Sequence, residues 1–157
     1  MHPNVDRVSA AAARAGLELE VRRFPEETRT AADAARAIGC EVAQIVKSLV
    51  FMADEAPVVA LVSGANLADT DALAHELGVD SVRRASGREA RDATGFAIGG
   101  VPPIGHDREL TIIVDRDLTT HDVVWAAAGL PDTVFPITPD DLVRASGGRV
   151  ADIGIRA

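Results

Sequence analysis

Residues 44–53 read QIVKSLVFMA, and residues 58–63 read VVALVS. Both runs are almost entirely apolar, which is typical of strands that a sheet buries on both faces. The segment DEAP lies between them and has the composition of a turn. The two runs therefore predict an antiparallel pair of strands, and this hairpin is the centre of the fold that the sequence implies.

Segments that begin with capping residues flank this hairpin and predict helices. Thr30 stands three residues before Asp33, and Ser86 begins the segment SGREARDA. Their hydroxyls can accept a hydrogen bond from the first turn of a helix, as can that of Thr138, which directly precedes Pro139. The predicted helices cover 5–15, 30–39, 69–78, 86–93 and 139–146.

Further strands are predicted from alternating or apolar runs. They cover 17–21, in a run that Pro25 ends after Phe24, then 81–85, 110–115, and a second hairpin of 122–128 with 133–138. Adjacent pairs of strands mixed with short helices are typical of an α+β fold. We therefore expect a single domain over residues 1–157, with a mixed, largely antiparallel β-sheet and flanking helices.

The composition of the 157 residues narrows the class of protein further. Hydrophobic residues make up 47% and charged residues 25%, which is ordinary for a globular chain. A single cysteine, Cys40, excludes an internal disulfide and fits a reducing cytosol. No apolar run approaches ~20 residues, so we expect a soluble, cytoplasmic protein that does not enter a membrane. The net charge of −8 argues against DNA or another long nucleic acid as a partner but permits one local basic patch.

Lys47 lies inside the run IVKSLVF, where every neighbour except Ser48 is apolar. In a strand, its side chain shares a face with Ile45, Leu49 and Phe51. Burial of a lysine is costly and lowers its pKa. One interpretation is an edge position, where the stem covers apolar surface and the ammonium reaches water. The other is a cation at the floor of a cleft that faces an anionic or ester substrate.

Residues 94–106 read TGFAIGGVPPIGH. Gly99 and Gly100 allow the backbone to approach a ligand closely, and Pro102 and Pro103 stiffen the loop beside them. The same residues also suit a plain corner between two strands. The segment has neither the GxGxxG pattern nor the Lys-Ser/Thr pair of a phosphate-binding P-loop, so it does not predict a site for a nucleoside triphosphate.

One basic stretch, RRASGREAR, interrupts the acidic chain directly before this loop. It carries Arg83, Arg84, Arg88 and Arg91. These four arginines either form a solvated helix face or contact the backbone phosphates of an RNA that lies beside the loop.

Other catalytic patterns are absent from the sequence. His2, His75, His106 and His121 have neither the i, i+4 spacing nor the nearby cysteines of a zinc site, so no metal is expected. No GxSxG element marks a serine nucleophile. Cys40 follows the end of a predicted helix and precedes an apolar run, which favours a buried small side chain over a nucleophile.

Three segments, in this order and spacing, resemble the YbaK/EbsC family: QIVKSLVF, TGFAIGGVPPIG and LTIIVD. Members of this family are free-standing relatives of the editing domain inserted in bacterial prolyl-tRNA synthetases. The resemblance covers nearly the whole chain, from the predicted helix TAADAARAIG to VADIG near the end. It implies a YbaK-like α+β fold and hydrolysis of the ester in a mischarged aminoacyl-tRNA, with no metal or other cofactor.

The resemblance also implies roles for individual residues. Lys47 matches the family lysine, which is regarded as the key active-site side chain near the terminal adenosine and its phosphate. The segment from Gly99 to Pro103 matches the family's GxxxP loop, whose backbone contacts the aminoacyl group. Pro102 stands where many members have serine, which removes a hydroxyl and an amide donor. The expected substrate-binding residues are Gly99, Gly100, Val101, Pro102, Pro103, Gly105 and His106.

The partner implied by the resemblance is the acceptor end of an aminoacyl-tRNA that carries a small amino acid. An aminoacyl ester is already activated, so a positioned water and stabilisation of the developing oxyanion are enough for hydrolysis. The alternative is a non-catalytic module that binds a small ligand or the tRNA end, with Lys47 as a counter-ion. The sequence leaves open whether the protein is a monomer or a homodimer.

Overall fold

The predicted hairpin forms the middle of the structure. Strand β2 (Val46–Ala53) pairs antiparallel with β3 (Ala56–Ser63) over their full lengths. Asp54 and Glu55 make the turn between them, and both have a positive φ, as a tight two-residue hairpin turn requires. The antiparallel pair predicted from the two apolar runs is therefore confirmed.

This hairpin belongs to a five-stranded sheet with the order β5-β2-β3-β6-β9. The other strands of this sheet are β5 (Val82–Arg84), β6 (Thr111–Asp115) and β9 (Arg149–Ala151). β5 is antiparallel to β2, whereas β6 is parallel to both β3 and β9. Two smaller antiparallel ladders complete the fold: β1 (Arg22–Arg23), β8 (Thr133–Ile137) and β7 (Val124–Ala127), and β4 (Asn66–Ala68) with β10 (Gly154–Arg156).

Four helices begin at the capping residues that the sequence indicates, whereas the first helix begins at Pro3, two residues before the predicted start at Val5. The side chains of Thr30, Ser86 and Thr138 each accept a hydrogen bond from the backbone N–H three residues later, and Asp69 does the same. The helices are α1 (Pro3–Arg14), α2 (Ala31–Ile38), α3 (Thr70–Leu77), α4 (Gly87–Thr94) and α5 (Pro139–Ser146), with short 3-10 turns η1 (Val42–Gln44) and η2 (Arg116–Thr120). The predicted α+β class, with mixed and largely antiparallel pairing and flanking helices, is confirmed.

Alternate residues of β3 face two different cores, as the apolar run predicts. Val59 and Leu61 pack into one core, and Ala60 and Val62 pack into the other. The first core also holds Val8, Phe96, Val114, Leu118, Phe135 and Leu142, and the second holds Phe51, Leu73, Ile113 and Ile153. A third, smaller cluster joins α2 to β8 through Ala34, Ala35, Ile45 and Val134.

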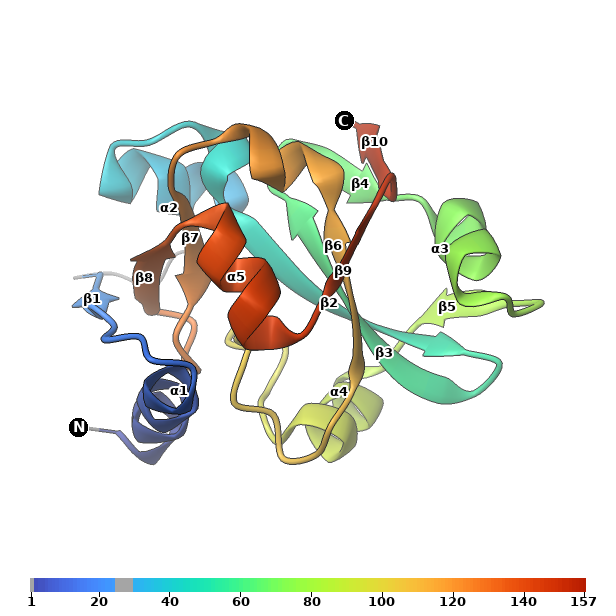
Figure 1. Ribbon diagram of the computed structural model, residues 1–157, viewed down its shortest axis with the longest axis horizontal. Coiled ribbons are helices and arrows are strands. Elements are labelled where there is room, and N and C mark those ends of the chain that lie inside the picture. Colours follow the sequence, from blue (N-terminus) through green and yellow to red (C-terminus); the bar gives the residue numbers. More distant parts are fainter. Residues whose placement is uncertain (1, 25–29) are drawn as a thin grey trace.

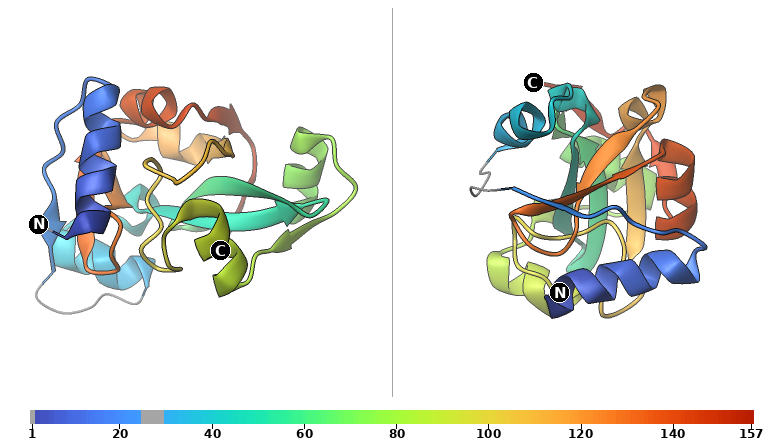
Figure 2. Two further views of the ribbon diagram at one scale, coloured as in Figure 1. Left: turned by 90° about the horizontal axis from the view of Figure 1, so that it is seen from below. Right: turned by 90° about the vertical axis from the view of Figure 1, so that its left-hand side faces the viewer.

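The computed structural model describes residues 2–24 and 30–157. In Figure 1 the β2–β3 hairpin crosses the molecule, with α2 and the β7–β8 hairpin at one end and α3 with β5 at the other. Figure 2 shows α1 on the same side of the molecule as β1 and the β7–β8 hairpin. No helix in the described part of the chain is long and apolar enough to cross a membrane.

One predicted strand is wrong. Residues 17–21 form no ladder, and the short strand β1 follows them at Arg22–Arg23. Leu17, Leu19 and Val21 are half-buried and pack on the first core, and the residues between them are exposed. The alternating pattern therefore indicates which residues are buried, but it does not indicate a paired strand. Pro25 lies outside the described residues. That residues 1–157 form one editing domain stays a prediction.

Candidate active site

A pocket lies beside the outer edge of β2. On this edge β5 pairs with β2 only from Phe51 to Ala53, and an isolated bridge joins Ile45 to Trp125. Among the described residues no strand pairs with the stretch between these two contacts. A backbone edge of this kind offers free N–H and C=O groups to a ligand.

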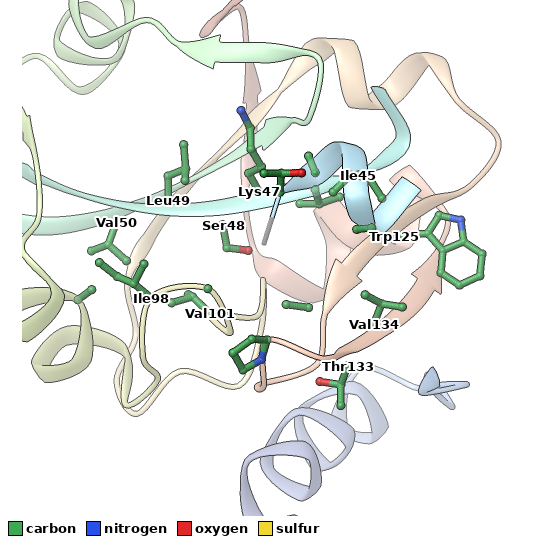
Figure 3. Close-up of a pocket in the computed structure, with 18 of the residues that line it drawn as sticks. Ile45, Lys47, Ser48, Leu49, Val50, Ile98, Val101, Trp125, Thr133 and Val134 are labelled. Carbon is green, nitrogen blue, oxygen red and sulfur yellow. The ribbon is translucent and has the colours of Figure 1, made fainter. Parts of the chain in front are cut away.

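The pocket has a volume of about 280 Å³ and is mainly apolar. Its walls come from α2, β2, the end of β5, Ala90 of α4, the loop after α4 and the β7–β8 hairpin (Figure 3). The apolar lining includes Ala34, Ile45, Val50, Val101, Trp125 and Val134. Pockets for drug-sized ligands span about 300–1,000 Å³, so this pocket suits a small acyl group better than a whole nucleotide.

Ser48 presents polar groups to the pocket from the middle of the open edge. The Ala85 N–H donates to the Val50 carbonyl at 3.0 Å on the β5 side. Residues two apart in a strand point their backbone groups to the same edge, so the N–H and C=O of Ser48 also point to that side. The Ser48 hydroxyl is shielded from solvent and has no hydrogen-bond partner among the described residues. In Figure 3 the Ser48 side chain lies on the side of β2 that faces Ile98 and Val101.

Lys47 is half-buried and points to the opposite side of β2, together with Leu49 (Figure 3). Its Nζ donates a hydrogen bond to the backbone carbonyl of Asn66 on β4. Burial lowers the pKa of Lys47, and repulsion by Arg84 lowers it further, whereas Asp115 raises it. Neither Lys47 nor Arg84 forms an ion pair with a described carboxylate. Two cations therefore lie beside the open edge of β2 without a direct counter-ion: Arg84 lines the pocket, and the Lys47 ammonium lies on the other face of the strand.

Lys47 is also the only lysine in the 157 residues, and every other member of the 16 Lys and Arg residues is an arginine. A lysine ammonium is compact and binds a ligand as a point charge, whereas a guanidinium is a planar fork. The chain thus has its one ammonium side chain on the strand that borders the apolar pocket, on the opposite face of that strand.

The loop after α4 contributes only two of its predicted residues to this pocket. Gly99, at φ +94°, and Val101 line the pocket. Gly100 is buried against the chain itself, because a Cβ at this position would lie 3.0 Å from the Gly129 carbonyl oxygen and 3.0 Å from the Leu130 Cα. The close backbone approach expected at Gly100 therefore occurs, but its partner is the β7–β8 turn.

The rest of the predicted substrate-binding set lies behind or away from the pocket. Pro102 is buried and does not line it. Pro103, Gly105 and His106 line a separate hollow beside α1 and α5. His106 Nε2 lies 2.7 Å from the Pro102 carbonyl oxygen, so this nitrogen carries a hydrogen and braces the loop. Burial lowers the pKa of His106. Direct contact between these residues and a substrate stays a prediction.

The four predicted RNA-binding arginines differ in their surroundings. Arg83 pairs with Glu55 and Glu89, so its charge is already neutralised, and these bonds raise its pKa. Arg84 lies over the ring of Phe51 and lines the pocket. Arg88 and Arg91 are exposed on α4. Of the four, Arg84, Arg88 and Arg91 form no ion pair with a described carboxylate, and contact between any of them and RNA stays a prediction.

Two further expectations concern Cys40 and metal ligands. Cys40 is half-buried against the cluster that joins α2 to β8, and burial raises its pKa, which disfavours a reactive thiolate. The His, Cys, Asp and Glu residues that the structure describes form no group of three that could hold a metal ion.

Three residues in or beside the site are not predicted from the sequence. Ser48 lines the pocket, and Asn66 and Asp115 lie behind Lys47. Ser48 becomes a candidate only in the structure, because it lies on the stretch of β2 that no strand in the described part of the chain covers. Asp115 is 1% exposed and accepts hydrogen bonds from the Asn66 side chain and from the Ser63 N–H. Its one signal in the sequence is an acidic residue at the end of the apolar run LTIIVD.

The family of the chain follows from its similarity to known proteins. A model of the aminoacyl-tRNA editing domain family matches residues 25–145. A crystal structure of a protein proposed to be a trans-editing enzyme for prolyl-tRNA synthetase is 43% identical, with a TM-score of 0.92 and 99% of each chain covered. The structure of the hypothetical protein APE2540 is 27% identical, with a TM-score of 0.88 and 95% of this chain and 99% of that chain covered.

Curated relatives include both free-standing and inserted forms. EbsC of Enterococcus faecalis, a protein proposed to deacylate Cys-tRNA(Pro) and Cys-tRNA(Cys), is 25% identical over 83% of this chain and 80% of its own. The proline–tRNA ligase of Streptococcus sanguinis is 31% identical over 81% of this chain, and the match spans 20% of that ligase. The resemblance predicted from the lysine strand and the glycine loop is confirmed, and the chain belongs to the aminoacyl-tRNA editing domain family.

Proposed function

We propose that this protein removes a small amino acid from a mischarged tRNA by hydrolysing its aminoacyl ester. The observation that carries the proposal is a small apolar pocket at the open edge of β2 with two cations beside it, Arg84 in the lining and Lys47 on the other face of the strand, neither of which has a described counter-ion. An acyl group of modest size fits the pocket, and the anionic 3′-terminal nucleotide of the tRNA supplies the missing negative charge.

The open edge of β2 offers a backbone hydrogen-bond donor to the carbonyl of the ester. We assign the Ser48 N–H to the ester carbonyl oxygen, where negative charge develops as water adds to the carbonyl carbon. The bond between that carbon and the ribose oxygen then breaks, and the proton that the water loses ends on the ribose oxygen. The products are the free amino acid and the tRNA with its terminal hydroxyl restored.

The two faces of β2 have different roles in this proposal. The Ser48 side faces the apolar pocket and receives the acyl group; Val101 lies across from it, and Gly99 is also part of the lining. The Lys47 side carries the ammonium, which we assign to the terminal nucleotide rather than to the amino acid. Lys47 is thus the catalytic residue that we propose, and the size of the pocket excludes large side chains by sterics.

A turnover assay tests this function against simple binding. Purified protein is mixed with excess alanyl-, cysteinyl-, seryl- and threonyl-tRNA, and the release of each amino acid is followed over time. We expect many turnovers per protein for at least one of these esters. Saturable binding without release of the amino acid would instead favour a non-catalytic module.

Ser48→Ala is expected to leave the melting temperature unchanged or slightly higher, because the hydroxyl that it removes has no partner in the described structure. We expect the Ser48 hydroxyl to make one hydrogen bond to the bound acyl group, so its loss should lower kcat/KM by about tenfold, which corresponds to about 1.4 kcal/mol. The measurements are thermal unfolding and deacylation kinetics on the preferred ester.

Ser63→Ala is the matched control, since the Ser63 hydroxyl donates to the Ala43 carbonyl at 2.8 Å. Removing it should lower the melting temperature and leave the preference among esters unchanged. If Ser48→Ala keeps the full kcat/KM for every ester, the hydroxyl has no part in substrate binding.

The exposed arginines of α4 give a separate prediction. Replacing both Arg88 and Arg91 by alanine should raise KM for tRNA and reduce the slope of log KM against log salt by about one for each phosphate that the protein no longer binds. Arg83→Ala should change this slope less, because Glu55 and Glu89 already neutralise that guanidinium. An unchanged slope in the double variant would remove these two arginines from the RNA-binding surface.

A further inference from the structure

A buried polar network lies directly behind Lys47, on the side of β2 away from the pocket. Asp115, at the end of β6, is 1% exposed, and Asn66, on β4, is 2% exposed. A buried carboxylate is costly unless it is fully hydrogen-bonded. Asp115 accepts from the Ser63 N–H at 3.0 Å, from the Asn66 side-chain amide at 2.9 Å and from the Asp117 N–H at 3.0 Å.

Asn66 links this carboxylate to Lys47. Its side chain donates to Asp115 and also to Asp117, at 2.8 Å, so both the position and the rotamer of Asn66 are fixed. Its backbone carbonyl accepts the hydrogen bond from Lys47 Nζ. The ammonium is therefore held through a chain of contacts that begins at the buried carboxylate.

The network is closed on its far side by β10. A Cβ on Gly154 would lie 2.5 Å from Asn66 Nδ2 and 2.8 Å from Asp115 Oδ2, so only a glycine leaves room for these groups. The side chain of Asn66 is thus enclosed between β6 and β10, and it cannot turn away without breaking hydrogen bonds of a buried charge.

We propose that Asp115 and Asn66 are positioning residues for Lys47: the buried carboxylate fixes Asn66, and the Asn66 carbonyl holds the ammonium beside the open edge of β2, on the face away from the pocket. The role of Lys47 in catalysis rests on the proposed function, whereas its placement by this network does not. Asp115 also contributes its charge, which favours the protonated form of Lys47 and opposes the effect of burial.

The charged groups around Lys47 come from several elements. Arg84 on β5 disfavours the ammonium, and Asp115 favours it. Asp117 in η2 is exposed, and Arg156 pairs with β4 in the β4–β10 ladder and is also exposed, so water screens both charges. Replacing the buried Asp115 should therefore shift the midpoint of the Lys47 titration more than replacing the exposed Asp117.

The single lysine makes this titration directly measurable. Reductive methylation with ¹³C-formaldehyde labels Lys47 and the N-terminal amine, and each methylated amine keeps its charge and an N–H. The Lys47→Met protein identifies the lysine signal by its absence. We expect the midpoint of the Lys47 titration to fall in Asp115→Asn, to rise in Arg84→Ala, and to stay close to wild type in Asp117→Asn, the matched control.

Kinetics provide the second arm of the test. Asp115→Asn should lower kcat by about 10–100-fold, the range expected when a hydrogen bond to a charged group is lost. In a Lys47→Met background it should lower kcat no further, because both changes then act through the same ammonium. Should Asp115→Asn fail to fold, Asn66→Ala replaces it, since it removes the amide that joins the carboxylate to Lys47.

The two proposals fail in different ways. A Lys47 titration that is the same in Asp115→Asn, Asp117→Asn and wild type would overturn the positioning role, even if the wild-type protein deacylates tRNA. An additive loss of kcat in the double variant would also overturn it. The predicted order of titration midpoints in a protein that releases no amino acid would support the network and overturn the deacylase.

Discussion

Lys47→Met is expected to reduce deacylation at least ~100-fold while the melting temperature stays at or above that of the wild-type protein. A 100-fold loss corresponds to about 2.7 kcal/mol of transition-state stabilisation. Methionine keeps an unbranched stem of similar length along Leu49 but removes the ammonium that we assign to the terminal nucleotide. The two readouts are single-turnover deacylation and thermal unfolding at neutral pH.

The direction of the stability change follows from the pKa of Lys47. Burial lowers this pKa below its usual value, so the folded protein binds the proton less tightly than the unfolded chain. The stability of the wild-type protein should therefore rise as the pH rises from the lowered pKa towards the usual value for lysine near 10.4. At neutral pH the charged lysine lowers the free energy of unfolding, and methionine removes this destabilisation.

Lys47→Arg is the matched control because it keeps a positive charge. The planar guanidinium cannot reproduce a compact ammonium that is held against one carbonyl, so we expect this variant to deacylate poorly as well. Normal deacylation by Lys47→Met, together with a lower melting temperature, would show that Lys47 is structural. Normal deacylation by Lys47→Arg alone would show that any positive charge at this position is enough.

The parts of the fold that follow from local chemistry could be predicted from the sequence. The β2–β3 hairpin depends on two apolar runs and a short turn, and each of the helix starts at Thr30, Ser86 and Thr138 depends on a hydroxyl within three residues of its donor. The position of Lys47 on the face of Leu49 follows from strand alternation alone. Such features need no knowledge of distant residues.

Features that depend on distant residues could not be predicted in the same way. Asn66 and Asp115 are 49 residues apart, and no periodic pattern links them. The open edge at Ser48 exists because β5 is too short to cover it, which no pattern within β2 reveals. The strand predicted at 17–21 is wrong for the same reason, since an alternating segment needs a partner in register before it forms a ladder.

The 94–106 loop shows this limit most clearly. Its glycines and prolines indicate a constrained backbone, and this is what the structure has. Which glycine faces the pocket depends on the turn near Gly129, about which the loop sequence says nothing. Gly99 borders the pocket, while Gly100 packs on that turn.

Gly100→Val is therefore expected to damage the fold rather than the chemistry alone. Its Cβ would meet backbone atoms of Gly129 and Leu130 at 3.0 Å, and backbone on a short turn cannot move aside as a flexible side chain can. Overpacking of this kind costs about 3 kcal/mol, which lowers the melting temperature of a domain of this size by about 6–12 °C.

Gly99→Ala is the contrasting variant in the same loop. A Cβ there meets nothing closer than the Pro131 Cγ at 4.0 Å, so the main cost is the positive φ of +94°, about 1–2 kcal/mol. Gly99→Ala should therefore melt only a few degrees below wild type, and its methyl group at the pocket wall should lower kcat/KM for the bulkier esters most. A Gly100→Val protein that melts within two degrees of wild type would show that the loop and the β7–β8 turn separate easily, and the bracing assigned to this loop would then be wrong.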